Sequence, residues 1–292
     1  MGKFKFHLVL FTVALIYGAT FSIAKDVMPE YLRSYGFIAL RVGFAAILFW
    51  IVHLIFIKEK VKGIKDYAEL FVCGFFGVAL NMSLFFKGLE TSLPIHGAVL
   101  MLAAPVFVLI FQKMIYKVKI TWLQWLGIFT ALIGSFFLIA GNGLQFDDTT
   151  WFGDLLIVFN AISYAFYLVF VKSVLEKYHF VTVAKWSFAF AFILVLPLGY
   201  EQLMETNFVI IPTFVWGEIL FVLFFTTFLT YFLNAYAIQN TSPSVVGSYI
   251  YLQPLLATSI AIILKKDFLT WEKVALALLI FAGVYMVNRK KL

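Results

Sequence analysis

Uncharged polar side chains recur at helical spacing inside long apolar stretches of this chain, and their types suit the binding of a small organic molecule. Thr226, Thr230 and Asn234 follow one another at intervals of four residues, so a helix would place them on one face. Polar groups are costly in an apolar core unless they form hydrogen bonds or face a cavity. The spacing therefore predicts either a polar cavity wall or hydrogen bonds between helices.

Phenol and amide groups form a second set of candidates. Asn160, Tyr164 and Tyr167 fall within two turns of one apolar stretch, and Tyr17 lies in another. Tyr rings can stack on an organic substrate and hydrogen-bond to it, although Tyr is also common at membrane interfaces. The depth of Tyr164 within its stretch favours a cavity.

A third set lies in two stretches that contain proline. Ser248 and Tyr251 share a helix face in the later stretch, and His96 lies in the earlier one. A His in a cavity can bind substrate or carry a proton near neutral pH, whereas one close to a helix start can equally lie at the membrane interface.

The prolines themselves predict exposed backbone acceptors. Proline inside a helix frees the carbonyl about four residues upstream. For Pro105 and Pro254 these carbonyls belong to Met101 and Ile250. They would line a cavity, or the prolines would produce only a packing kink.

Charged residues near helix ends form a fourth set. Lys87 and Glu90 are three residues apart and are expected to pair on one helix face. Arg41 lies about two turns inside an apolar stretch, so it needs a partner such as Glu90 or Asp26, or a path to water. An outer gate, a structural ion pair and snorkelling are the alternatives. Asp154 is expected to cap the start of a helix.

The composition leaves few polar residues from which a functional site could be built. The chain has 292 residues, of which 63% are hydrophobic and 13% are charged. A water-soluble domain is about 25% charged, so this is an integral membrane protein. The composition excludes a cytosolic enzyme, a nucleic-acid binder and a secreted disulfide scaffold, since the one cysteine, Cys73, lies inside an apolar run.

The apolar runs predict ten membrane-spanning helices joined by short connectors. An all-α integral membrane protein follows. The expected spans are 6–26, 33–57, 67–88, 92–115, 120–140, 151–174, 182–200, 213–238, 243–264 and 271–288.

The distribution of basic residues predicts the orientation. Most of the 22 lysines and arginines fall in segments on one side if the N-terminus lies in the cytoplasm. The positive-inside rule then places both termini in the cytoplasm, and a plasma membrane location is the default. The Lys265-Lys266 pair falls on the outer side and does not fit the rule. Residues 1–24 are expected to be a retained first helix and not a cleaved signal peptide.

An internal repeat divides the chain. At a shift of 149 residues Pro94 and Pro105 fall on Pro243 and Pro254, and at a shift of 147 Tyr17 falls on Tyr164. The shift of 149 also brings Asn81 onto Thr230, which would place two polar positions near mid-span.

The repeat predicts two five-helix halves, residues 1–145 and residues 146–292. Because five is odd, the second half must enter the membrane from the opposite side, so the repeats are inverted. Inverted repeats are typical of secondary transporters, whose binding site lies near the midplane between the halves. A duplicated scaffold without a transport role is the alternative.

Several motifs resemble a known family. The segment from Tyr17 to Lys25, the segment Ala39-Leu40-Arg41-Val42-Gly43-Phe44, and Gly153-Asp154-Leu155-Leu156 are similar to signatures of EamA-type transporters of the drug/metabolite transporter superfamily. The resemblance implies a ten-helix carrier with both termini inside. It also implies that small metabolites, amino acids or toxic compounds are moved, commonly outward.

The sequence departs from the family pattern at two places. Tyr17 stands where the family often has Trp, and Val118 stands where it often has Glu before the fifth helix. Asp267 keeps an acid at the corresponding place of the second half, so a shared role for that acid is in doubt.

The leading hypothesis is a secondary transporter that moves a neutral or zwitterionic, amino-acid-like metabolite by alternating access, as an exporter. A membrane-embedded lipid-modifying enzyme and a channel are the alternatives. The sequence has no paired carboxylates, metal-ligand cluster or phosphate-binding loop inside its spans. We therefore expect no enzyme activity, cofactor, metal or nucleic-acid partner, only a small-molecule substrate and the bilayer. The predicted substrate-binding residues are Tyr17, Asn81, His96, Asn160, Tyr164, Tyr167, Thr230, Asn234, Ser248 and Tyr251.

Overall fold

The computed structural model describes residues 4–28, 30–140, 150–263 and 268–288, and all regular elements in these residues are helical. The predicted boundary between residues 145 and 146, the Lys265-Lys266 pair and Asp267 lie outside the described residues. The side chain of Lys25 is also outside the description.

The first half of the chain forms five helical stretches, three of which are interrupted or change their hydrogen-bond pattern. They are α1 (Phe4–Val27), α2 (Ser34–Val52) with η1 (His53–Ile57), α3 (Ile64–Gly74) with η2 (Phe75–Ala79) and α4 (Leu80–Thr91), α5 (Pro94–Met101) with α6 (Ala104–Tyr116), and α7 (Trp122–Ala140).

The second half repeats this order of stretches. They are α8 (Trp151–Leu175), α9 (Phe180–Glu205), α10 (Thr213–Phe221) with η4 (Val222–Leu229) and α11 (Thr230–Asn240), α12 (Pro243–Ser248) with η5 (Tyr249–Tyr251) and α13 (Leu252–Ile263), and α14 (Trp271–Asn288). A short turn, η3 (Phe208–Ile210), precedes α10.

Each predicted span coincides with one of these stretches. Within the described residues, eight helices are long and apolar enough to cross a membrane. The first helix has a shorter apolar part, Lys5–Thr20, and η5 separates α12 from α13. The all-helical membrane architecture is confirmed, and the count of ten spans stays a prediction.

Irregular turns recur at matching places in the two halves. The third stretch of each half contains a π-helical turn, η2 in the first and η4 in the second. The fourth stretch of each half is broken, between α5 and α6 and at η5. Pro105 and Pro254 follow these breaks, and each lacks the N–H that would bond to the carbonyl four residues upstream.

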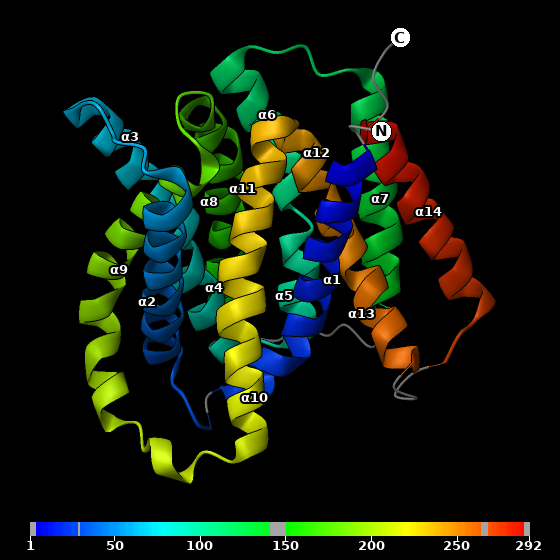
Figure 1. Ribbon diagram of the computed structural model, residues 1–292. Coiled ribbons are helices and arrows are strands. Elements are labelled where there is room, and N and C mark those ends of the chain that lie inside the picture. The colour runs from blue at the N-terminus through cyan, green and yellow to red at the C-terminus, as the bar shows by residue number, and fades with distance from the viewer. Residues whose placement is uncertain (1–3, 29, 141–149, 264–267, 289–292) are drawn as a thin grey trace.

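The helices of the two halves are interleaved, so helices of each half pack between helices of the other. The helix α2 lies along α9, and α7 lies along α14, so both pairs join the halves (Figure 1). The helix α1 packs against α11 and α13 of the second half, while α8 packs against α4 and α6 of the first. These reciprocal contacts place the first helix of each half at the centre.

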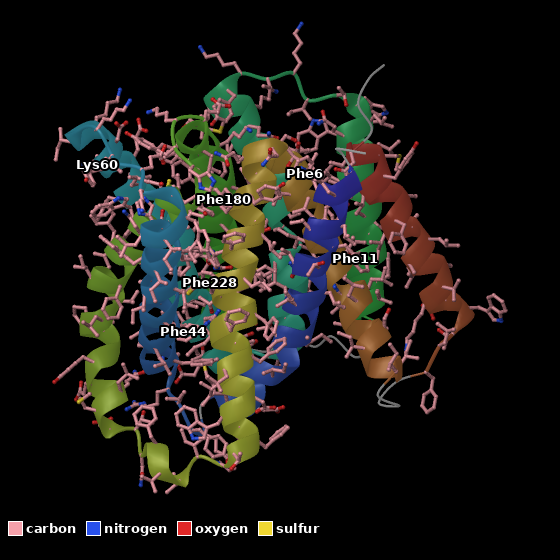
Figure 2. All side chains as sticks on the ribbon, viewed as in Figure 1. Phe6, Phe11, Phe44, Lys60, Phe180 and Phe228 are labelled. Carbon is pink, nitrogen blue, oxygen red and sulfur yellow. The ribbon has the colours of Figure 1, made fainter. Side chains whose placement is uncertain are left out.

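Corresponding helices run in opposite directions. Figure 1 shows α1 running away from the end of the molecule at which α14 finishes, while α8 runs toward that end. Lys60 lies at the same end (Figure 2). Lys177 directly follows the last turn of α8, so its ion pair with Glu69, 2.6 Å apart, lies at this end as well. The hydrogen bond to Glu69 raises the pKa of Lys177. At the other end Arg33 pairs with Glu205 at 3.2 Å.

A glycine contact sets the spacing of α7 and α14. A Cβ added at Gly283 would lie 2.5 Å from the amide nitrogen of Ala131 and 2.6 Å from the carbonyl oxygen of Gly127. Backbone atoms cannot move aside as a flexible side chain can, so only glycine allows this approach. By contrast, a Cβ added at Gly217 in α10 would meet no atom within 4 Å.

We therefore expect Gly283→Ala to destabilise the protein and Gly217→Ala to leave it unchanged or slightly more stable. Overpacking at Gly283 should cost about 1–3 kcal/mol. The measurement is the thermal unfolding midpoint of both variants in detergent, and equal midpoints would contradict the close packing of α7 and α14.

Candidate functional site

A cavity lies where the two halves meet. It has about 740 Å³ of space free of protein atoms, counting its open mouth. Its walls come from α1, α2, α4 and α5 of the first half and from α8, η4, α11, η5 and α13 of the second. The central placement follows from the reciprocal packing of α1 and α8.

Both halves supply polar groups to the wall. The first half supplies a phenol, a hydroxyl, a guanidinium and an amide, from Tyr17, Thr20, Arg41 and Asn81. The second half supplies two amides, two phenols and a hydroxyl, from Asn160, Tyr164, Thr226, Tyr231 and Gln253.

The rest of the wall is apolar. It is formed by two aromatic rings and four aliphatic or thioether side chains, from Met82, Phe85, Phe86, Leu89, Met101 and Ile250. Met101 and Ile250 are the residues whose carbonyls the prolines free, so the prediction that these two positions face the cavity is consistent with the structure. No carboxylate lines the cavity among the described residues.

The side-chain amide of Asn160 has a hydrogen-bonded nitrogen and an oxygen without a hydrogen-bond partner among the described residues. Its Nδ2 donates to the backbone carbonyl of Asn81 at 2.7 Å, which joins α8 to α4. Because a carbonyl only accepts, the contacting atom must be the amide nitrogen. The Oδ1 atom is buried and has no partner among the described residues. The cavity therefore offers an acceptor at this point.

The phenol of Tyr17 lies at the junction of α1 and α11. Its hydroxyl interacts with the side chains of Thr230 and Asn234. Tyr17 and Tyr164 line both the main cavity and a smaller adjoining hollow, which Asn234 also lines. Thr230 itself is buried off the cavity wall and donates to the carbonyl of Thr226.

The neighbouring phenols are fixed by packing and hydrogen bonds. Tyr231 donates to the carbonyl of Gly77 at 2.8 Å, which joins α11 to η2. The rings of Tyr164 and Tyr167 stack with centroids 6.3 Å apart. Tyr167 is buried behind Tyr164 and does not line the cavity. Sequence spacing placed both rings on α8 correctly, but only Tyr164 reaches the cavity wall.

Arg41 lies in the cavity wall, away from both carboxylates expected as its partners. Its Nε donates to the hydroxyl of Thr227 at 2.9 Å, and the guanidinium lies over the ring of Phe86 at 4.3 Å. Glu90 instead accepts hydrogen bonds from Ser34 at 2.6 Å and from Lys87 at 3.2 Å. The predicted Lys87–Glu90 pair is confirmed, and the expectation that Glu90 pairs with Arg41 is wrong.

His96 belongs to a separate network between α5 and α8. Its Nδ1 lies 3.1 Å from both carboxylate oxygens of Asp154, and the ring is fully buried. Ser92 and Thr150 also donate to Asp154. His96 does not line the cavity. Asp154 lies inside the first turn of α8 and does not cap it, which corrects the expected role.

Ser248 and Tyr251 also lie away from the cavity. The hydroxyl of Ser248 donates to the carbonyl of Val245 at 2.8 Å and accepts from Asn288 at 3.4 Å. Tyr251 is fully buried and its carbonyl accepts from Ser135 at 3.0 Å. These hydrogen bonds join Ser248 to α14 and Tyr251 to α7.

The predicted substrate-binding set left out the polar wall residues Thr20 and Gln253, and also Arg41, Thr226 and Tyr231. Thr20 lies one turn after Tyr17, and its hydroxyl bonds to that of Thr226 at 2.8 Å. Gln253 directly precedes Pro254. Helical spacing from Tyr17 would have found Thr20, and the break before Pro254 would have pointed to Gln253.

The comparisons with known proteins match the duplicated architecture. The model of the EamA-like transporter family matches residues 5–140 and again residues 151–289. The chain belongs to the EamA-like transporter family. Its two family units coincide with the two sets of five helical stretches, and the gap between them falls in the connector from α7 to α8.

Relatives of this EamA-like transporter carry consistent names. The protein named uncharacterized transporter YyaM of Bacillus subtilis (strain 168) is 26% identical over 97% of this chain and 93% of its own length. An uncharacterized transporter of Archaeoglobus fulgidus is 25% identical over 98% of both chains. A solved crystal structure superposes with a TM-score of 0.78 at 15% identity over 98% of both chains, which shows the same fold.

The His96–Asp154 network should contribute to stability. We expect Asp154→Asn to lower the free energy of unfolding by about 1–3 kcal/mol, because buried donors lose a charged acceptor. The same change at the exposed Arg33–Glu205 pair, Glu205→Gln, should cost at most about 1 kcal/mol. Thermal unfolding in detergent measures both, and a larger loss at Glu205 would contradict a structural role for the network.

Proposed function

We propose that this EamA-like transporter is a secondary transporter that moves a small, neutral or zwitterionic, amino-acid-like metabolite by alternating access. One observation carries the proposal. The cavity lies between the two family units and takes its wall from both of them. A site at such an interface can be exposed to either side of the membrane when the halves rearrange.

The symmetry of the scaffold supports alternating access. Matching π-helical turns and matching helix breaks occur in both halves, and corresponding helices run in opposite directions. One half-fold in two orientations permits two mirrored arrangements of similar energy. The broken stretches α5–α6 and α12–α13 meet the cavity at Met101 and Ile250, where bending would change its shape.

The chemistry of the cavity supports a small organic substrate. Its wall combines apolar side chains with a small number of polar groups, as small-molecule sites do. The apolar rings of Phe85 and Phe86 suit the body of such a molecule. The free acceptor of Asn160 and the guanidinium of Arg41 suit the two ends of a zwitterion.

The orientation belongs to the proposal as well. The lysine-rich connectors lie at the end where α1 begins and α14 finishes, so we place that end in the cytoplasm of the cell. We further propose that the protein resides in the plasma membrane and moves its substrate out of the cell.

Transport can be tested in liposomes that contain the purified protein. A panel of radiolabelled amino acids and related metabolites is offered outside vesicles preloaded with the same compound. We expect flux that saturates and is accelerated by the preloaded compound, which is the behaviour of a carrier. Flux that never saturates would indicate a channel, and chemical conversion without flux would indicate an enzyme.

Two cavity residues provide matched substitutions. We expect Asn81→Ala and Tyr164→Ala to lower the initial transport rate about fivefold to tenfold, the effect of losing about 1 kcal/mol of binding. Asn81→Ala keeps the backbone carbonyl that Asn160 uses. The rate is measured with the amount of inserted protein held equal.

The controls repeat these changes outside the cavity. Asn240 and Tyr285 are exposed at helix surfaces, so Asn240→Ala and Tyr285→Ala should transport normally. If the cavity variants also transport normally, the substrate does not bind at this wall.

A further inference from the structure

Arg41 places an unpaired positive charge in the membrane-embedded cavity. Its side chain is 3% exposed. The ion pairs found among the described residues do not include it. Its Nη1 atom is buried without a hydrogen-bond partner in the same part of the chain. A buried cation without a counter-charge is unfavourable, so this group calls for an anion.

The surrounding contacts hold the guanidinium in one orientation. The hydroxyl of Thr227 donates to the carbonyl of Val222 at 2.8 Å, so its oxygen faces Arg41 as an acceptor and takes the Nε hydrogen bond. The rings of Phe86 and Phe37 lie 4.3 Å and 5.6 Å from the guanidinium carbon. These contacts engage Nε and place two aromatic rings beside the guanidinium, while Nη1 has no hydrogen-bond partner among the described residues. A planar fork held in this way is suited to a planar anion.

The position is also asymmetric between the halves. At the two shifts that relate the halves, 147 and 149 residues, Arg41 corresponds to Phe188 and Phe190. The position in α9 that corresponds to Arg41 is therefore a phenyl ring. The buried cation of α9, Lys185, lies against Trp50 and His53 and does not line the cavity. The internal symmetry of the fold does not require a charge at this position, which supports recognition of a ligand.

We propose that Arg41 is an anion subsite of the cavity and binds the carboxylate of the transported molecule. The proposal rests on the proposed function and names the group that is recognised, a single carboxylate, which the zwitterionic substrate of the proposed function carries together with an amino group. Arg41 is the one cation in the described wall, and a doubly charged phosphate would call for more. The absence of a carboxylate in that wall disfavours purely cationic compounds.

Ligand binding to the purified full-length protein tests the subsite. The probes are apolar monocarboxylates, each compared with its primary amide: phenylacetate with phenylacetamide, 4-methylpentanoate with 4-methylpentanamide, and L-leucine with L-leucinamide. Inorganic phosphate is a further probe. The measurement is the rise of the unfolding midpoint with ligand concentration at constant ionic strength, which reports the dissociation constant.

We expect at least one carboxylate to bind at least tenfold more tightly than its amide. Arg41→Met should abolish this preference, and Arg41→Lys should retain part of it, because a lysine keeps the charge but loses the planar fork. Equal binding of acid and amide, an unchanged preference in Arg41→Met, or tighter binding of phosphate through Arg41 would each overturn the assignment.

The ligand-free protein gives a second readout that separates binding from structural support. A residue kept for ligand binding is held at the expense of stability, so Arg41→Met should unfold at the same or a higher temperature than the parent. Arg33→Met, which breaks an exposed ion pair, is the matched control. A lower midpoint for Arg41→Met, together with unchanged carboxylate preference, would make Arg41 a structural residue.

Flux measurements distinguish failure of this inference from failure of the proposed function. Saturable exchange of the amides, with Arg41→Met behaving as the parent, would overturn the anion subsite and leave the carrier in place. Binding of a carboxylate through Arg41 without any exchange would support the subsite and overturn the transport function.

Discussion

Hydrocarbon offers no hydrogen bonds, so a polar group buried in this protein is costly unless it finds a partner inside the protein. The contacts between helices follow from this constraint. Tyr231 donates to the carbonyl of Gly77, Ser163 to that of Phe76, and Asn160 to that of Asn81. Lys172 donates to the carbonyls of Ile238 and Gln239. The first three contacts join side chains of the second half to backbone carbonyls of the first, at or next to the π-helical turn η2. The contacts of Lys172 join α8 to the end of α11 within the second half.

Because of the same constraint, buried polar atoms without a hydrogen-bond partner are informative about the ligand. Among buried side-chain atoms without a partner in the described residues, Nη1 of Arg41 and Oδ1 of Asn160 are the two that belong to the cavity wall. One is a charged donor and the other is a neutral acceptor. A molecule that carries both an anionic group and an N–H would hydrogen-bond to both atoms at once. These two unpaired atoms therefore indicate the chemistry of the ligand.

The two halves of the chain share one helical scaffold, and the residues that differ between the halves supply the specific chemistry of the cavity and its surroundings. The order of helices, the π-helical turns η2 and η4, and the breaks before Pro105 and Pro254 are shared by the halves. Arg41 is not shared, and the network of His96 and Asp154 joins α5 to α8. A symmetric scaffold lets two arrangements have similar energy, whereas an asymmetric wall recognises one orientation of a substrate.

The sequence by itself determined the helices, their approximate ends and the duplication, because apolar run length and proline position act locally along the chain. It also identified Tyr17, Asn81, Asn160 and Tyr164 as polar groups that a cavity would use, and all four line the cavity.

Only the tertiary structure decided which helix faces meet. It brought Arg41 to the cavity and turned Ser248 and Tyr251 toward α7 and α14. It also placed His96 beside Asp154 and away from the cavity. Helical spacing shows which side chains share a face, but the partner of that face depends on how α1 and α8 pack into the opposite half. That arrangement is set by contacts between residues far apart in the chain, such as Gly127 with Gly283, which no local pattern records.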